Sequence, residues 1–230
     1  MGSNQHRITY AVDLVFCIDA TQSMDHIIEV VKNNALNFYG DLTARMEEKH
    51  KTVEKLRIRL IAFRDYTYDG KDAMAMTDFF ELPEQAADFE ATIRSIKPKG
   101  GGDDPEDGLE ALAYAMKSKW NTDASRYRHV IVVWSDDGTH KLGFGKKAPN
   151  YPKGMPENFE ALSDWWGSRA NPSDIMNQSS KRLLLFTPDK PGWSDIRENW
   201  DKVIQYVSEA GDGLESCDYE QILHAICNSI

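Results

Sequence analysis

The stretch VDLVFCIDATQSMDHIIEVV, residues 12–31, decides the fold. Residues 12–18 are mostly apolar and rich in β-branched and aromatic side chains, which predicts a strand buried on both faces of a parallel sheet. Apolar residues then recur at helical spacing over 25–46, which predicts an amphipathic helix packed on that sheet. The junction between these two elements carries one carboxylate and two hydroxyls: Asp19, Thr21 and Ser23.

Strands and helices alternate along the rest of the chain. Further strands are predicted at 56–66, 74–82, 128–140, 181–188 and 203–211. Helices are predicted over 82–96 with Pro83 in the first turn, through Trp120 after an acidic stretch, within 157–168, and from Tyr219 to about Cys227. Because the link between 56–66 and 74–82 is short, the second of these strands is expected to run antiparallel at an edge.

This order of elements predicts an α/β fold with a doubly wound, mostly parallel six-stranded sheet, one antiparallel edge strand and helices on both faces. Residues 1–10 are expected to form a tail and residues 11–230 a single domain. The connection at about 140–180 is long, and such loops in compact domains are usually functional. Ligands bind to this kind of sheet at the carboxyl ends of the strands, where the acidic clusters of this chain lie.

Composition narrows the classes of partner. The formal net charge of −10, without a local basic patch, argues against binding to nucleic acid or to a membrane surface. No run approaches the ~20 apolar residues of a membrane span, and the polar start has no signal peptide. The three cysteines lack the dense spacing of secreted disulfide scaffolds. We therefore expect a cytoplasmic protein with no nucleic-acid or membrane partner.

The oxygens that follow the first strand suit a hard divalent cation. Mg²⁺ prefers carboxylate, hydroxyl and water oxygens, and alternate spacing in 19–23 lets a turning loop aim three of them at one point. Carboxylates from 103–107 and from Asp136 could complete the shell. The alternative is a helix N-cap, because Asp, Thr and Ser are ordinary helix starters. The pentapeptide DATQS alone leaves both interpretations open.

Three segments together carry a family resemblance. DATQS (19–23), GGGDDPED (100–107) and VVWSDDG (132–138) follow one another in the order of the metal-ion-dependent adhesion site of von Willebrand factor A-type (vWA) domains. DATQS resembles the DxSxS element of that site, with Thr21 in place of its first Ser. The resemblance covers roughly residues 11–229 and implies the same Rossmann-like sheet.

The resemblance also implies the remaining ligands. DDPED is similar to the DxPE segment in the A-type domains of integrin β-subunits, which makes Glu106 the expected acidic ligand and Asp103 and Asp104 its rivals. WSDDGTH is similar to the strand-four segment whose aspartate contributes through water, and the match falls on Asp136. Asp137 is expected to add to the electric field of the site without a bond to the metal.

The integrin-like match raises the possibility of a second cation site. Asp103 and Asp65 occupy the corresponding places, but Gly101 stands where that family has an Asn, so one oxygen donor is lost. The favoured role of Asp65 is therefore pairing with Arg64 or capping of its own loop.

Two further features allow two interpretations each. His140 follows the acidic cluster of WSDDGTH and could lie near the metal edge, although a solvated loop histidine is favoured. Four apolar side chains of the long connection could form an exposed partner-binding patch, although packing on one face of the sheet is favoured: Phe159, Leu162, Trp165 and Trp166.

The resemblance implies a protein-interaction module. In such a module a bound Mg²⁺, for which Mn²⁺ or Ca²⁺ could substitute, is left one ligand short and is completed by an acidic residue of a partner. We expect a regulatory or scaffold component of an intracellular complex that contains a kinase, a phosphatase or an AAA-type ATPase. DLVFCIDAT (13–21) is also similar to the A-type domain attached to some α-kinases.

The alternative function is that of an Mg²⁺-dependent phosphohydrolase, in which the same strand-end carboxylates hold the metal. Haloacid-dehalogenase phosphatases carry two aspartates separated by one residue after the first strand, and here the second position is Thr21. The chain also has no Walker phosphate loop. We therefore expect a binding protein without catalytic residues.

Overall fold

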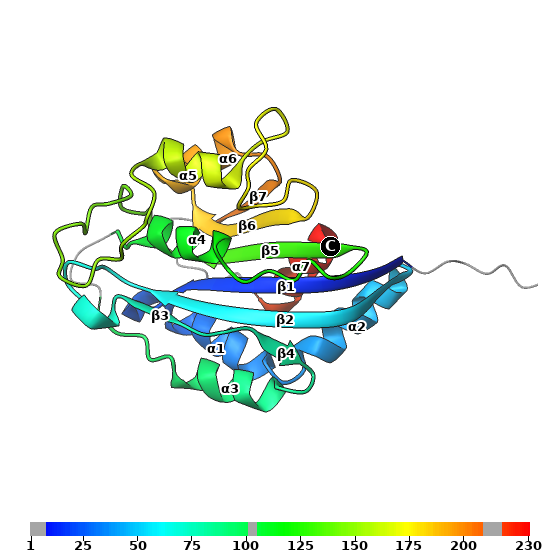
Figure 1. The fold of residues 1–230 in the computed structure, drawn as a ribbon. Helices are drawn as coiled ribbons and strands as arrows, with labels where there is room; N and C mark the ends of the chain where they lie inside the picture. Colours follow the sequence, from blue (N-terminus) through cyan, green and yellow to red (C-terminus); the bar gives the residue numbers. More distant parts are fainter. Residues whose placement is uncertain (1–7, 101–104, 209–217) are drawn as a thin grey trace, which may run out of the picture.

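The computed structural model describes residues 8–100, 105–208 and 218–230, and these form one twisted sheet covered by helices (Figure 1). The strands are β1 (Ile8–Asp19), β2 (Lys51–Phe63), β3 (Met74–Met76), β4 (Phe80–Leu82), β5 (Tyr127–Trp134), β6 (Lys181–Pro188) and β7 (Val203–Ser208). Their order in the sheet is β3-β2-β1-β5-β6-β7, and β4 also pairs with β2. Pairing is parallel except where β3 and β4 meet β2, so the predicted mixed, doubly wound sheet is confirmed.

The antiparallel edge consists of two short strands where one was predicted over 74–82. Thr77 interrupts the strand, because its hydroxyl accepts a hydrogen bond from Leu60 N at 3.0 Å and its carbonyl accepts one from Arg59 Nε at 2.8 Å. A side-chain oxygen thus occupies a position that a strand backbone would use. The chain then returns to the edge of β2 as β4.

The first strand is longer than predicted and carries a buried acid, Asp13, in its interior. Asp13 is paired in register with Arg57 on β2, whose guanidinium donates to both carboxylate oxygens at 2.8 and 2.6 Å. Asn121 N donates a third hydrogen bond to Asp13 at 2.6 Å. A buried carboxylate is tolerated in this strand because it is both paired and hydrogen-bonded.

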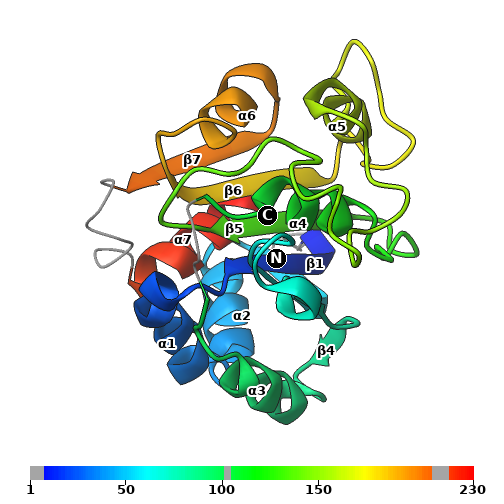
Figure 2. The same ribbon diagram turned by 90° about the vertical axis from the view of Figure 1, so that its left-hand side faces the viewer.

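The helices cover the two faces of the sheet (Figure 2). One face carries α1 (Asp25–Asn34), α2 (Phe38–Glu48), α3 (Ala86–Ser95) and α7 (Tyr219–Ser229). The other face carries α4 (Gly108–Met116), α5 (Phe159–Trp166) and α6 (Trp193–Asn199), the last of which the sequence patterns did not predict. Short 3₁₀ turns lie at Gln22–Met24 and Gly70–Asp72. In the described part of the chain no helix is both long enough and apolar enough to cross a membrane.

The single helix predicted over 25–46 is wrong, because the chain forms α1 and α2 with a turn between them at 35–37. Asn34 ends α1, since its side-chain amide donates to Val30 O at 2.8 Å. The turn leaves Leu36 about half exposed and returns Phe38 to the core.

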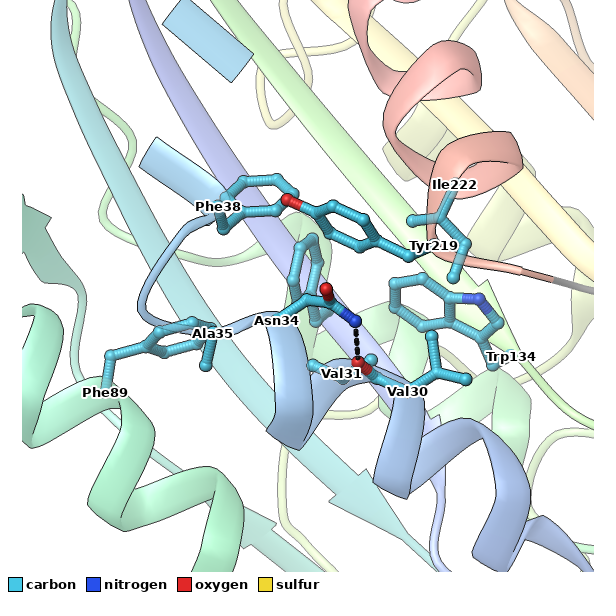
Figure 3. A pocket seen from close by; sticks show the side chains of 10 residues that line it. Val30, Val31, Asn34, Ala35, Phe38, Phe89, Trp134, Tyr219 and Ile222 are labelled. Carbon is cyan, nitrogen blue, oxygen red and sulfur yellow. Dashed lines mark hydrogen bonds between the residues drawn. The ribbon is translucent and has the colours of Figure 1, made fainter. Parts of the chain in front are cut away.

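A small cavity of about 20 Å³ remains where α1 turns into α2 (Figure 3). Its walls come from α1, α2, α3, α7 and the central strands: Phe16, Val30, Val31, Asn34, Ala35, Phe38, Phe89, Trp134, Tyr219 and Ile222. This lining is almost wholly apolar, so a water molecule would find too few hydrogen-bonding partners there.

Two predicted helix boundaries are also wrong. The helix predicted through Trp120 ends at Met116, whose carbonyl accepts a hydrogen bond from Trp120 Nε1 at 2.9 Å. Pro83 lies in a turn before α3 rather than in its first turn.

The tryptophans of the long connection belong to the core. Trp166 and Leu162 are fully buried against the sheet, and Phe159 and Trp165 pack on the same cluster. Lys117 Nζ lies 3.8 Å from the centre of the Trp165 ring, so the lysine side chain covers part of the ring surface that does not face the core. The interpretation as an exposed partner-binding patch is therefore wrong, and the favoured interpretation is confirmed.

Candidate metal centre

The loop after β1 brings three oxygen-bearing side chains together. Asp19 Oδ1 accepts hydrogen bonds from Thr21 N at 3.0 Å and from Thr21 Oγ1 at 2.6 Å. Thr21 Oγ1 lies 3.3 Å from Ser23 Oγ. Asp19 and Thr21 are buried at 1% and 5% exposure, whereas Ser23 is exposed to solvent. The loop therefore aims these oxygens at one another, as the alternate spacing predicted.

The N-cap interpretation of this loop is wrong. Thr21 is the N-cap residue of the 3₁₀ turn and Met24 that of α1, and neither side chain accepts a hydrogen bond from the helix that follows. Asp19 bonds to Thr21 instead of to the first turn of α1. The carboxylate and hydroxyls are thus not used for helix capping.

The second oxygen of Asp19 faces the loop after β5. Asp19 Oδ2 accepts a hydrogen bond from Ser135 Oγ at 3.0 Å, and Ser135 is buried. Sequence reasoning missed Ser135, although a hydroxyl directly after a buried strand was the available signal. Burial is the main cause of the raised pKa of Asp19, and charge repulsion from Asp136, the residue after Ser135, adds to it. The loops after β1 and β5 therefore meet through Asp19 and Ser135.

Asp137 has protein partners at the end of β5. Its carboxylate forms an ion pair with Lys190, and its carbonyl accepts a hydrogen bond from Trp193 Nε1 at 3.0 Å. α6 and the turn before it bring these donors to the end of β5, and the expectation that Asp137 does not coordinate the metal stays a prediction.

Glu106 lies in the segment before α4, which packs on the loop after β5. Its backbone forms an isolated bridge with Thr139, and its carbonyl accepts hydrogen bonds from Thr139 Oγ1 and His140 N, both at 3.0 Å. The side chain is only 2% exposed, yet neither carboxylate oxygen has a hydrogen-bond partner among the described residues. The rival ligands Asp103 and Asp104 lie outside the described residues.

The electrostatics of the site show an excess of buried negative charge. Burial, and secondly the charge of Asp19, raises the pKa of Glu106 to about 9. Burial raises the pKa of Asp19 to about 6 against the opposing hydrogen bonds from Thr21. Within the described ranges no basic side chain forms an ion pair with either carboxylate. Ionised carboxylates in this setting need a counter-charge, and carboxylate and hydroxyl oxygens are the ligands that Mg²⁺ takes. The residues present therefore fit a divalent cation.

Arg64 anchors the loops around this cluster. Its guanidinium, 5% exposed, donates to four backbone carbonyls at 2.9 Å each: Ala20, Lys97, Lys99 and Asp72. The predicted pairing of Arg64 with Asp65 is therefore wrong, because the guanidinium is already occupied by the backbone.

Asp65 lies in a neighbouring buried group. Its Oδ1 accepts from Thr67 N and from Tyr68 N, so the prediction that it caps its own loop is confirmed. Its Oδ2 lies 2.8 Å from His140 Nε2. His140 is only 8% exposed, so the favoured interpretation as a solvated loop histidine is wrong. The second site predicted from Asp65 with Asp103 involves a residue outside the described ranges.

Comparison with known proteins agrees with this architecture. Residues 13–126 match the sequence family described as von Willebrand factor A domain. A crystal structure of the pilus adhesin SpaC from Lactobacillus rhamnosus GG superimposes with a TM-score of 0.51 and 14% identity, over 95% of this chain and 30% of that one. The fold is that of a vWA domain. The vWF domain of the pilus tip protein Mfa5 from Porphyromonas gingivalis gives a partial match, with a TM-score of 0.35 and 20% identity over 57% of this chain and 39% of that one.

A curated relative shows the vWA-type sequence within a longer protein. The alpha-protein kinase vwkA of Dictyostelium discoideum is 25% identical over 154 residues, which are 67% of this chain. The match spans only 23% of that kinase, so less than a quarter of the length of this relative is matched.

Proposed function

We propose that this vWA domain is a divalent-metal-dependent protein-interaction module. The metal, Mg²⁺ with Mn²⁺ or Ca²⁺ as substitutes, is held by oxygens from three loops and is completed by an acidic residue of a partner. The proposed ligands are Asp19, Thr21, Ser23, Glu106 and Asp136. The observation that supports this proposal most directly is the buried carboxylate of Glu106, whose two oxygens have no partner among the described residues.

The physical argument starts from the cost of burying charge. An ionised carboxylate that is removed from water without a partner is strongly disfavoured, which is why the pKa of Glu106 is raised. When bound, the metal supplies the positive charge that lets Asp19 and Glu106 ionise together, and it attracts a further acidic group. Ser135 holds the Asp19 carboxylate in place through its Oδ2 hydrogen bond.

The partner is proposed from chemistry and from the relative. A site that binds a cation through its own acids attracts a carboxylate of another protein only through that cation. Partner binding should therefore require the bound cation and an acidic residue on the partner. The similarity to alpha-protein kinase vwkA supports a partner or covalently linked domain of the kinase class. A phosphatase or an AAA-type ATPase is the alternative partner. With any of these partners, we propose a regulatory or scaffold role in the cytoplasm.

We propose binding rather than catalysis at this site. The residue two positions after Asp19 is Thr21, whose hydroxyl is engaged with Asp19 itself, so the pair of aspartates that a haloacid-dehalogenase phosphatase needs is not present. A phosphohydrolase remains the function that the experiment must exclude.

Calorimetry with Mg²⁺ tests the metal site. The parent is expected to bind one Mg²⁺ at this site, and Asp19→Ala is expected to lose it. Asp25→Ala is the matched control, because Asp25 is an exposed acid at the start of α1. Equal Mg²⁺ affinity of the parent and Asp19→Ala would refute the site.

Two further assays separate binding from catalysis. Partner capture by the parent and by Asp25→Ala is expected in Mg²⁺, and loss is expected in EDTA or with Asp19→Ala. Hydrolysis of a generic phosphomonoester by the parent with Mg²⁺, abolished in Asp19→Ala, would overturn the binding role in favour of the phosphohydrolase.

A further inference from the structure

A second group of potential ligands lies beside the candidate Mg²⁺ centre. It is formed by Asp65 from the loop after β2, Asp107 from the segment before α4, and His140 from the loop after β5. One ligand atom from each residue lies within 4.8 Å of the others, and all three residues are buried. We propose that Asp65, Asp107 and His140 form a separate site for Zn²⁺ or a similar transition-metal dication. We call this group the Asp–Asp–His site.

One carboxylate oxygen of this group has no hydrogen-bond partner among the described residues. Asp107 is fully buried, and while its Oδ2 accepts a hydrogen bond from Tyr66 N at 2.7 Å, its Oδ1 has no partner among the described residues. Buried carboxylate oxygens are almost always satisfied by a donor, a water or an ion. The sequence offered Asp107 only as one of the carboxylates of 103–107, and the family resemblance singled out its neighbour Glu106 instead.

The types of ligand indicate the class of metal. One imidazole nitrogen and two carboxylate oxygens are a set that Zn²⁺ accepts, with a fourth position left to water. The Mg²⁺ centre offers only oxygens, whereas imidazole favours later transition metals. The two sites therefore differ in the metals that they should select.

The distances allow closure around an ion. Ligands at about 2.0–2.2 Å from a tetrahedral Zn²⁺ lie roughly 3.3 Å apart, and the three ligand atoms here already lie within 4.8 Å of one another. His140 Nε2 and Asp65 Oδ2 are 2.8 Å apart, which is a hydrogen-bond distance. Metal binding at Nε2 would replace this hydrogen bond, and the neutral imidazole would then carry its proton on Nδ1.

The surrounding residues hold the ligands in place. Backbone N–H groups of the 66–68 turn donate to Asp65 Oδ1 and to Asp107 Oδ2. The ring of His140 stacks on Phe144, with ring centroids 3.8 Å apart and an interplanar angle of 14°. Such outer contacts fix ligand orientation in metal sites.

The loop that follows His140 closes over the Asp–Asp–His site. A Cβ added at Gly145 would lie only 2.8 Å from Tyr66 Cβ, so the loop backbone packs directly on the 66–68 turn. Glu110 Oε1 ties the same loop to α4, because it accepts hydrogen bonds from Gly143 N at 2.8 Å and from Tyr151 OH at 2.7 Å. Metal binding here would therefore stabilise the first part of the long connection.

Calorimetry with Zn²⁺ in saturating Mg²⁺ tests this proposal. The parent is expected to bind one Zn²⁺ per chain, and His140→Gln and Asp107→Asn are expected to weaken that affinity about tenfold or more. The matched control is His26→Gln, because His26 is an exposed histidine outside the Asp–Asp–His site. Equal Zn²⁺ affinity of His140→Gln and the parent would overturn the proposal.

Two measurements keep the test independent of folding defects and of the proposed function. Co²⁺ added to the parent should give the visible absorption of a four-coordinate site with nitrogen and oxygen ligands, and its absence would also overturn the proposal. Asp19→Ala is expected to keep its Zn²⁺ affinity while losing Mg²⁺, and His140→Gln to keep Mg²⁺. Failure of the Asp19→Ala variant to lose Mg²⁺ would refute the interaction module without affecting the Zn²⁺ result.

Discussion

Replacing Glu106 by Gln should stabilise the metal-free protein and abolish its response to Mg²⁺. In the metal-free parent the pKa of Glu106 rises from an ordinary 4.5 to about 9 on folding, so the carboxyl group takes up a proton when the chain folds at pH 7. Protonating Glu106 at pH 7 lowers the free energy of unfolding by about 3 kcal/mol, because the interval from 4.5 to pH 7 counts at about 1.4 kcal/mol per pKa unit. This is an upper figure, because Asp19 and other nearby acids share the repulsion. Gln is neutral in both states, so the variant avoids this cost.

The sign of the pH dependence follows from the same shift. Between pH 4.5 and about 9 the folded parent holds one more proton at Glu106 than the unfolded chain does. The free energy of unfolding of the metal-free parent therefore falls as pH rises through this window, by up to about 1.4 kcal/mol per pH unit from this group. The corresponding curve of Glu106→Gln should be shallower.

Urea unfolding in EDTA and in Mg²⁺ at several pH values measures both effects. Mg²⁺ at a hundredfold excess over its Kd should stabilise the parent by about 2.7 kcal/mol and should leave Glu106→Gln unchanged. Glu160→Gln is the matched control, since Glu160 is an exposed acid on α5 and should behave like the parent. A Glu106→Gln protein that is less stable than the parent in EDTA, or that Mg²⁺ stabilises equally, would refute the reasoning.

Three further substitutions test the site and the core. Ser135→Ala removes the hydrogen bond to Asp19 Oδ2 and should weaken Mg²⁺ affinity by roughly tenfold or more in calorimetry; an unchanged Kd would mean that Ser135 does not orient the ligand. Trp166→Ala should lower the free energy of unfolding by about 3–5 kcal/mol while leaving Mg²⁺ affinity intact, because Trp166 is fully buried in the core. Asp13→Ala leaves Arg57 without its bidentate partner and should cost about 3 kcal/mol in urea unfolding, whereas a loss below about 1 kcal/mol would mark this pair as a surface-like ion pair.

The sheet and one half of the candidate site could be predicted because their signals are local. Buried parallel strands appear as short apolar runs, and DATQS directly follows one of them, so its position at the sheet edge follows from the fold class. The convergence of Asp19 and Thr21 follows from their spacing alone. These features need no knowledge of distant partners.

The features that sequence patterns missed depend on contacts between distant segments. The burial of His140 results from its pairing with Asp65, which is 75 residues away in the chain. Thr77 breaks the edge strand because its hydroxyl accepts a hydrogen bond from Leu60 N on the neighbouring strand. Long-range partners therefore decided which of two plausible local interpretations was correct.

The four carbonyl contacts of Arg64 have a consequence for protein engineering. The Ala20 carbonyl belongs to the DATQS loop, and the Lys97 and Lys99 carbonyls belong to the segment that leads toward Glu106, so one side chain sets the spacing of two ligand-bearing loops. A graft of DATQS alone onto another parallel sheet would leave the Ala20 carbonyl without its donor. A working transplant would have to carry Arg64 and residues 97–99 with it, although none of them offers an oxygen to the metal through its side chain.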